Sequence, residues 1–115
     1  MYLSPVLQAA LRSTHGYDVV DPGKVNDELG GKQGFELLTE TLKNKGLGVV
    51  LDIVPNHMAI SGPQNRWWQD VLENGPSSAY AAFFDVEWES PEAYLKNRIL
   101  PLYWKISMAG SWEPA

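Results

Sequence analysis

Residues 47–57 read LGVVLDIVPNH and decide the fold class predicted for this chain. The run of Leu, Val and Ile over residues 47–54 has the length of a strand and is almost continuously apolar, which is typical of a parallel strand buried on both faces. Asp52 lies near the end of this run, Pro55 starts a turn, and Asn56 and His57 follow side by side. We therefore predict a buried parallel strand whose carboxyl end carries three polar side chains.

A helix is predicted directly before this strand, over residues 32–45. Phe35, Leu38 and Leu42 fall at positions i, i+3 and i+7, which is the spacing of one buried helix face. Gly46 stands where a left-handed residue commonly ends a helix. The helix and the strand form the second half of a βαβ unit, and residues 2–6, YLSPV, are the candidate first strand. The predicted fold class is α/β, as an open sheet or a barrel.

Two other segments have a different composition. Residues 12–31, RSTHGYDVVDPGKVNDELGG, are rich in turn-forming residues, so we expect a long loop, and loops of this length tend to be functional. Residues 61–84 contain two Gly-Pro pairs and two short helix-like pieces. Residues 83–89, FFDVEWE, alternate apolar and acidic side chains, which predicts a half-buried strand. The second half of the chain is expected to be an excursion from the sheet.

Composition limits the classes of partner. The chain has 115 residues, 44% of them hydrophobic and 20% charged, which is typical of one folded domain. A formal net charge of -5 without any Lys/Arg cluster argues against nucleic acid and anionic membranes as partners, and favours a neutral substrate. The chain has no cysteine, no apolar run of membrane-spanning length and no signal-peptide pattern at its start. The default expectation is a cytoplasmic location.

Aromatic residues are abundant, with five Trp and five Tyr. Flat rings fill protein cores, and they also stack on the apolar faces of sugars. The helix and strand spacing of four of them favours core packing, and sugar platforms are the alternative: Trp67, Trp68, Phe84 and Trp88.

The chemistry-bearing residues are expected at the carboxyl ends of the strands, where ligands bind in parallel α/β folds. Asp52 suits either a structural role, capping a turn or anchoring an arginine, or a place in a site. His57 is either a structural histidine or a ring that presents an N–H to a ligand hydroxyl group. Asn56 can fix the turn through its amide. No acidic cluster has the spacing of a metal site, so neither a metal nor a cofactor is expected.

The motif DIVPNH, residues 52–57, resembles the first conserved motif of the α-amylase family of glycoside hydrolases and transglycosylases. The stretches STHGYDVVDP, VNDELGG and WWQDVLENGPSSAYAAFFDVEW are similar to a narrower branch, the maltooligosyltrehalose synthases, or (1→4)-α-D-glucan 1-α-D-glucosylmutases. The similarity runs from about residue 2 to residue 100. The resemblance implies a partial (β/α)8 TIM barrel that supplies about strands 2 and 3, with the start of the insertion that follows strand 3.

The resemblance also implies roles for four residues. His57 would hydrogen-bond the glucose whose bond is broken, and Tyr17 would be the aromatic platform on which the same glucose stacks. Asn56 would hold the turn, and Asp52 would orient the neighbouring catalytic machinery.

Four further residues are weaker candidates for the sugar-binding site. Asp18 and Asp21 would organise the loop, with direct contact to sugar as the alternative. Many relatives have an acid before the Gly-Tyr pair where this chain has Ser13, Thr14 and His15, so His15 or Thr14 is expected to replace its polar contact. Trp68 is the fourth, as a possible platform.

The implied reaction moves the reducing-end glucose of a maltooligosaccharide, an α-1,4-glucan, from an α-1,4 to an α,α-1,1 linkage, as in trehalose. Retention of the anomeric centre needs a nucleophilic carboxylate and an acid/base carboxylate about 5 Å apart. In the family these acids follow later barrel strands, so no catalytic residue is expected in this chain, and the isolated chain should be inactive. The alternatives are another α-amylase-family hydrolase or transglycosylase, and a non-catalytic α-glucan-binding module.

Three regions follow from the resemblance. Residues 1–60 are predicted to be part of the barrel, residues 61–100 the start of the insertion, and residues 101–115 an aberrant tail. Codons can be chosen for residues 101–115 that read, in a neighbouring frame, as VILEDQYGRVLGAG, which resembles the family's continuation. The corresponding hypothesis is a frameshift near Leu100.

Overall fold

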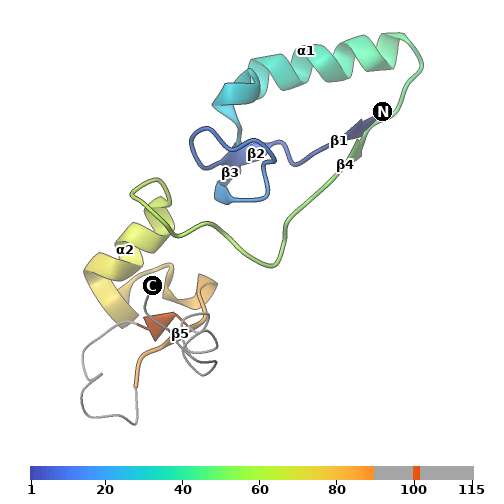
Figure 1. Cartoon of the computed structure of the whole chain (residues 1–115). Coiled ribbons are helices and arrows are strands. Elements are labelled where there is room, and N and C mark those ends of the chain that lie inside the picture. Colours follow the sequence, from blue (N-terminus) through green and yellow to red (C-terminus); the bar gives the residue numbers. More distant parts are fainter. Residues whose placement is uncertain (90–99, 102–115) are drawn as a thin grey trace, which may run out of the picture. The chain divides into compact units, whose positions relative to one another are not determined.

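The computed structural model describes residues 1–89 and 100–101 of the chain (Figure 1). The chain divides into two compact units, Met1–Arg66 and Trp67–Ala115, which are described separately below. The end of the predicted insertion, residues 90–99, and most of the predicted tail, residues 102–115, lie outside the described residues. The frameshift hypothesis therefore stays a prediction.

The first unit contains the predicted βαβ unit. Strand β1 (Tyr2–Leu3) pairs in parallel with β4 (Val50–Leu51), and helix α1 (Gly31–Asn44) lies between them in the sequence. The backbone N–H of Val50 donates to the Met1 carbonyl over 2.8 Å, and that of Asp52 donates to the Leu3 carbonyl over 3.0 Å. The parallel pairing predicted for these two segments is confirmed.

Helix α1 begins and ends close to the predicted bounds. Leu42 is buried and Phe35 and Leu38 are half-buried on one face, whereas Leu37, on the flank, is 67% exposed. Gly46 has a φ of 69°, in the left-handed region. The Gly46 N–H donates to the Lys43 carbonyl and the Leu47 N–H to the Leu42 carbonyl, which is the bonding of a Schellman motif. The predicted glycine cap is confirmed.

The prediction that residues 12–31 form one loop is wrong in part. This segment contains strand β3 (Val19–Val25), which pairs antiparallel with β2 (Leu7–Ala9), and a short 3-10 helix, η1 (Asp27–Leu29). Val19 and Val20 are 3% and 5% exposed, and Ala9 opposite them is 1% exposed, so the pair is stabilised by burial. The register shifts twice along the pair, which accommodates the turn residues Pro22 and Gly23 within a strand.

Strand β4 is shorter and more open than its sequence predicted. The strand has two residues. Val50 within it is 63% exposed, and Ile53 just after it is 67% exposed. A strand is buried on both faces only when other layers cover both. Helix α1 instead packs on β3 and η1, so the prediction of a strand buried on both faces is wrong for the described chain.

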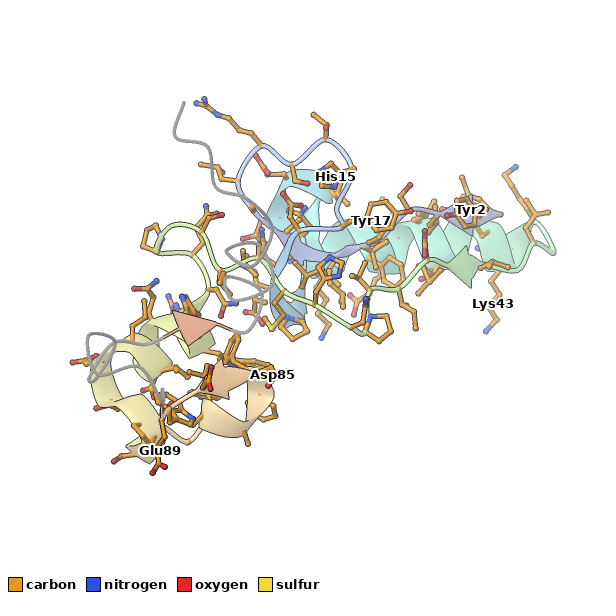
Figure 2. The ribbon with its side chains drawn as sticks, turned by 60° about the horizontal axis from the view of Figure 1, so that its bottom comes forward. Tyr2, His15, Tyr17, Lys43, Asp85 and Glu89 are labelled. Carbon is orange, nitrogen blue, oxygen red and sulfur yellow. The ribbon has the colours of Figure 1, made fainter. Side chains whose placement is uncertain are left out.

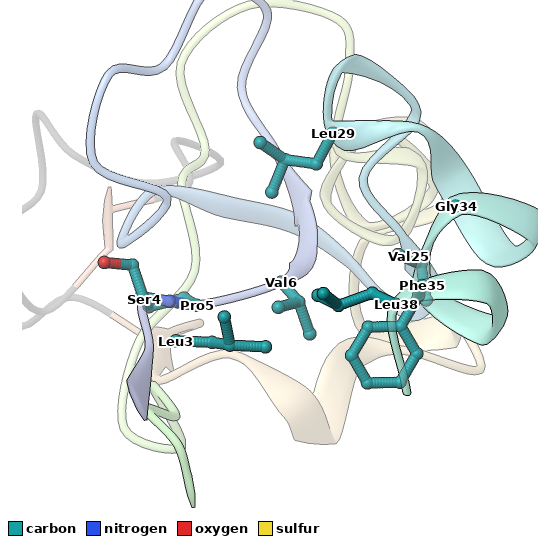
Figure 3. A pocket seen from close by; sticks show the side chains of 9 residues that line it. All are labelled: Leu3, Ser4, Pro5, Val6, Val25, Leu29, Gly34, Phe35 and Leu38. Atoms are coloured by element: carbon teal, nitrogen blue, oxygen red, sulfur yellow. The ribbon is translucent and has the colours of Figure 1, made fainter. Parts of the chain in front are cut away.

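An apolar pocket of about 320 Å³ lies beside α1 in the first unit (Figure 3). Its walls come from the segment after β1, from the end of β3 and from the buried face of the helix, and include Leu3, Pro5, Val6, Val25, Phe35 and Leu38. These side chains offer almost no hydrogen-bonding groups. The pocket is therefore a poor place for a polar ligand.

The second unit contains helix α2 (Arg66–Asn74), two 3-10 helices, η2 (Gly75–Ser77) and η3 (Ala81–Phe83), and strand β5 (Val86–Glu87), which pairs antiparallel with β6 (Leu100–Pro101). Trp68 and Val71 of α2 are 5% and 0% exposed. The Trp68 ring lies 5.0 Å from the Phe84 ring, centroid to centroid. The predicted strand in residues 83–89 is confirmed over its centre, and its partly buried face belongs to this small core.

Replacing Gly46 by alanine is expected to lower the free energy of unfolding by about 1 kcal/mol, because a Cβ is disfavoured at positive φ. No atom lies within 4 Å of the position that the new Cβ would take, so the cost is conformational and not steric. Urea denaturation followed by circular dichroism measures the change. Gly48→Ala is the matched control, because Gly48 has equally open surroundings without a positive φ. Equal effects of the two substitutions would contradict the assignment of the cap.

Candidate functional site

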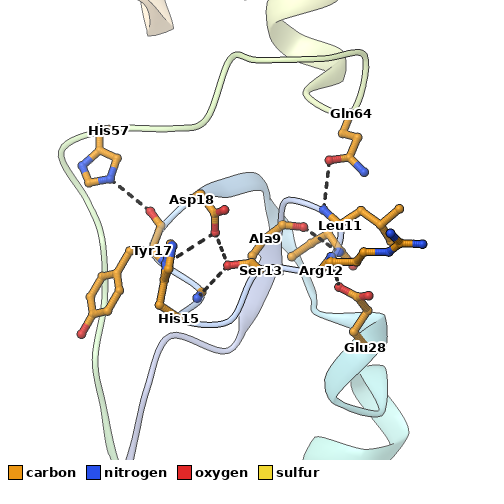
Figure 4. A network of polar contacts seen from close by, with 12 residues as sticks. Ala9, Leu11, Arg12, Ser13, His15, Tyr17, Asp18, Glu28, His57 and Gln64 are labelled. Carbon is orange, nitrogen blue, oxygen red and sulfur yellow. Dashed lines mark hydrogen bonds and ion pairs between the residues drawn. The ribbon is translucent and has the colours of Figure 1, made fainter.

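Three residues that the sequence marked as site candidates come together beyond the carboxyl end of β4. The Tyr17 hydroxyl group donates to Oδ2 of Asp52 over 2.5 Å. Nε2 of His57 lies 3.1 Å from the carbonyl oxygen of Tyr17, as Figure 4 shows. Tyr17 comes from the segment between β2 and β3, whereas Asp52 and His57 follow β4. The two segments are far apart in sequence and are joined here by side-chain contacts.

Tyr2 is a fourth member of this group and was missed from the sequence. Its hydroxyl group donates to the same Oδ2 atom of Asp52 over 2.7 Å. Figure 2 shows Tyr2 and Tyr17 on the same side of the first unit. In the parallel register Tyr2 lies opposite Val50, and Asp52 is two residues further along on the same face. Tyr2 could have been recognised as a site residue only from the register in which β1 pairs with β4. The spacing of apolar residues in the sequence does not reveal that register.

The shared carboxylate changes the acidity of all three groups. Hydrogen bonds from Tyr17 and Tyr2 lower the pKa of Asp52 below its ordinary value. The hydrogen bond to Asp52, followed by desolvation and the carboxylate charge, raises the pKa of Tyr17 to about 12. The pKa of Tyr2 is raised chiefly by the same hydrogen-bonded carboxylate. Asp52 is thus a firmly ionised acceptor at neutral pH, which suits positioning and not proton donation.

His57 uses one ring nitrogen within the protein. A carbonyl oxygen only accepts, so Nε2 carries the proton that is donated to Tyr17. In the neutral ring Nδ1 is then an acceptor. The sequence indicated a ligand hydroxyl group as one partner for a ring N–H of His57, and in the structure the Tyr17 carbonyl oxygen accepts this N–H.

The loop around Tyr17 is organised by its own polar side chains. His15 stacks on Tyr17 with ring centroids 5.9 Å apart, and its Nδ1 accepts the Tyr17 backbone N–H over 3.0 Å. Asp18 accepts a short hydrogen bond from the Ser13 hydroxyl group, and its Oδ1 lies 3.8 Å from Nδ1 of His15. Asp21 accepts the Gly23 backbone N–H over 2.8 Å. Both aspartates have the contacts of a loop-organising residue.

The remaining candidates lie apart from these contacts. Asn56 is exposed, and no hydrogen bond joins its side chain to the described part of the chain, so its role in the turn stays a prediction. Trp68 belongs to the second unit and is 5% exposed against Phe84, which is the packing alternative stated for it. Trp67 stacks on Tyr80 at an interplanar angle of 7°.

Two kinds of feature are absent from the described residues: a metal-binding cluster and a membrane-spanning helix. Within residues 1–89 and 100–101, no group of three or more His, Cys, Asp or Glu side chains is placed to hold a metal ion. In the same part of the chain, no helix has both the length and the apolar character needed to cross a membrane.

The geometry supports recognition of a neutral, hydroxyl-rich ligand. Tyr17 is 40% exposed although its hydroxyl group and its carbonyl oxygen are engaged and His15 stacks on its ring, so the ring face that His15 leaves uncovered is the part that remains for a ligand. Nδ1 of His57 and Oδ1 of Asp52 are polar groups on the same residues that hold this ring. An aromatic face combined with acceptor groups is typical of sites that bind sugar rings.

Comparison with known proteins defines the class. The family model for the alpha-amylase catalytic domain matches residues 1–113. The chain therefore belongs to the alpha-amylase family, and its fold is of the α/β class found in those enzymes.

Within that family the chain is similar to maltooligosyltrehalose synthases. It is 50% identical over 103 residues to the "Putative maltooligosyl trehalose synthase" of Mycobacterium tuberculosis, which covers 89% of this chain and 13% of that protein. The solved maltooligosyltrehalose synthase of Arthrobacter ramosus is 49% identical, with a TM-score of 0.73 over 76% of this chain and 12% of that one. An intracellular maltogenic amylase of Bacillus subtilis is 35% identical over 86 residues, 75% of this chain and 14% of the amylase.

Replacing Asp52 by asparagine is expected to return the pKa of Tyr17 from about 12 toward its ordinary value of 10.0, since the carboxylate is the first cause of the shift. The raised pKa of Tyr17 contributes to the free energy of unfolding below pH 10. This contribution is lost as the pH rises through the pKa that Tyr17 has in the folded chain. The stability from the lowered pKa of Asp52 is present above its unfolded value and is lost as the pH falls through the folded one. The Asp52→Asn variant should show neither the alkaline nor the acid dependence of stability on pH.

Absorbance of ionised tyrosine near 295 nm, recorded against pH, measures the first effect. Asp85→Asn is the control, because Asp85 is an exposed acid of the second unit without contact to these tyrosines. A wild-type chain in which every tyrosine ionises near pH 10 would show that the shared hydrogen bonds do not form.

Proposed function

We propose that this chain forms part of the sugar-binding site of a maltooligosyltrehalose synthase, at the glucose whose bond is broken. Its first unit would supply about strands 2 and 3 of a (β/α)8 barrel, and its second unit the start of the insertion after strand 3. The chain spans 13% of the length of the M. tuberculosis relative. The nucleophile and the acid/base would lie in parts of such an enzyme that this chain does not span.

The single observation that carries the proposal is the joining of Tyr17, Asp52 and His57. These residues belong to two motifs that the sequence associated with one sugar subsite, and they are linked by two hydrogen bonds. Asp52 accepts from two tyrosine hydroxyl groups, and such a carboxylate is a poor nucleophile and a poor acid. The segment would bind and orient the sugar, while the nucleophile and the acid/base come from elsewhere in the barrel.

The substrate would be a maltooligosaccharide, and the reaction an intramolecular transfer of its reducing-end glucose to an α,α-1,1 linkage. The released glucose must remain in the site and turn before it attacks the glycosyl-enzyme. A stacked ring face supports this step, because stacking resists loss of the sugar while leaving it free to rotate about the ring normal. A hydrolytic amylase is the rival, and the lower identity to the maltogenic amylase, 35% against 50%, disfavours it.

A graft tests the proposal. Residues 1–89 of this chain replace the corresponding segment of the A. ramosus synthase, and the hybrid enzyme is incubated with maltopentaose. The expected product is a maltooligosaccharide ending in a trehalose unit, seen as loss of reducing ends without release of glucose. The rate is expected to lie within about tenfold of the parent enzyme, since the segments are 49% identical.

The matched control grafts the corresponding segment of the B. subtilis maltogenic amylase into the same host. That hybrid is expected to lose most of the transfer activity. Thermal melting of both hybrids separates misfolding from altered chemistry. A folded hybrid carrying residues 1–89 that only hydrolyses maltopentaose would refute the proposal and favour the hydrolase alternative.

In the active hybrid, Tyr17→Ala is expected to lower kcat/KM about tenfold, equivalent to about 1.4 kcal/mol of lost ring contact. Tyr17→Phe keeps the ring face and removes the hydrogen bond to Asp52, so its loss should be smaller, about fivefold. Initial rates with maltopentaose measure both variants. Equal losses for the two would show that the hydroxyl group and not the ring face serves the substrate.

A further inference from the structure

Two tyrosine hydroxyl groups converge on one carboxylate oxygen in the candidate site. Tyr2 and Tyr17 both donate to Oδ2 of Asp52, over 2.7 Å and 2.5 Å. Turning the Asp52 carboxylate about its terminal bond would move this oxygen away from both donors at once. The orientation of Asp52 is therefore set by these two donors together with the backbone of Ile53, which also hydrogen-bonds to the carboxylate.

Tyr2 is the donor that is held by strand backbone. Its residue pairs with Val50 in the parallel ladder, and the Asp52 N–H donates to the Leu3 carbonyl next to Tyr2 over 3.0 Å. Side chains placed on paired strands are positioned more accurately than those on loops. The Tyr2 hydroxyl group and the Asp52 carboxylate are thus held in fixed relative positions by the paired strands.

Tyr17, in contrast, lies in the connection between β2 and β3. The residue is 40% exposed, and the described ring contact that it makes is the stacking with His15, so burial alone does not hold the ring. Its backbone is fixed by His15 and by His57, and the far end of its ring is fixed at the hydroxyl group by Asp52. If the Asp52 carboxylate lost its orientation, the first effect would therefore be a change in the tilt of the Tyr17 ring.

We propose that Tyr2 is a positioning residue for the sugar-stacking ring of Tyr17, acting through the Asp52 carboxylate. Tyr2 sets the direction of Asp52, and Asp52 sets the tilt of the Tyr17 ring. Tyr2 is 63% exposed, so its hydroxyl group, and not burial of its side chain, is the part that matters here. The inference rests on the proposed function, which assigns Tyr17 to the sugar.

A double-mutant cycle in the full 115-residue chain tests the coupling without reference to the reaction. Tyrosine labelled with ¹³C at the ring carbon next to the hydroxyl group is titrated by NMR in the wild type, Tyr2→Phe, Asp52→Asn and the double variant. Tyr2→Phe is expected to shift the pKa of Tyr17, because it leaves Oδ2 of Asp52 with the Tyr17 hydroxyl group as its one tyrosine donor. On the Asp52→Asn background the same substitution should have little further effect. Equal effects on both backgrounds would overturn the proposal.

Tyr80→Phe is the control in this titration. Tyr80 lies in the second unit and stacks on Trp67, and its substitution leaves the Asp52 contacts intact. It is expected to leave the pKa of Tyr17 unchanged. A shift as large as that of Tyr2→Phe would mean that the readout reports general loosening of the chain, and would also overturn the proposal.

Kinetics in the grafted synthase give the functional readout. Tyr2→Phe is expected to lower kcat about fivefold with KM within about twofold, because a residue that only aligns the reacting glucose leaves the other sugar contacts in place. A raised KM with unchanged kcat would mean that Tyr2 binds sugar directly, and unchanged kinetics would mean a structural role only. Either result overturns the proposal. If the cycle shows coupling but the graft forms no trehalose linkage, the proposed function fails while the positioning of Tyr17 stands.

Discussion

The parallel pairing of β1 with β4 is the constraint on which the rest of the first unit depends. Its register sets Tyr2 opposite Val50, so that Asp52 emerges on the same face within reach of the Tyr2 hydroxyl group. A slip of one residue would turn Asp52 to the opposite face and break both tyrosine contacts. Tyr17 is attached to Asp52, and His57 to Tyr17, so the whole group follows from a ladder of two residue pairs.

The features that the sequence predicted well are those with a local cause. Helix α1 follows from the spacing of Phe35, Leu38 and Leu42, and its end follows from the conformational freedom of Gly46. Tyr17, Asp52 and His57 were found because each stands in a recognisable motif. Their joining could be expected from the general rule that loops at the carboxyl ends of parallel strands lie together.

The features that were missed depend on pairing between distant segments. Strand β3 contains Pro22 and Gly23, which are typical of turns, so the sequence did not predict a strand there. The strand forms because Val19 and Val20 are buried beside Ala9. Tyr2 was missed because nothing local distinguishes it from other strand tyrosines. The apolar run around β4 predicted burial on both faces, but burial needs covering layers, and Ile53 is 67% exposed. Under the proposed function those layers are the other strands and helices of a barrel.

The contact between His57 and Tyr17 restricts how the two residues can share a ligand. A neutral imidazole has one N–H, and here it is donated from Nε2 to the Tyr17 carbonyl oxygen. A sugar hydroxyl group that took this proton would leave the carbonyl without its donor. The same hydroxyl group can instead donate to Nδ1, which costs the protein no hydrogen bond, because a hydroxyl group both donates and accepts. Under the proposed function, His57 is therefore better suited to accept a hydrogen bond from the sugar than to donate one to it, and it keeps the Tyr17 backbone in place while doing so.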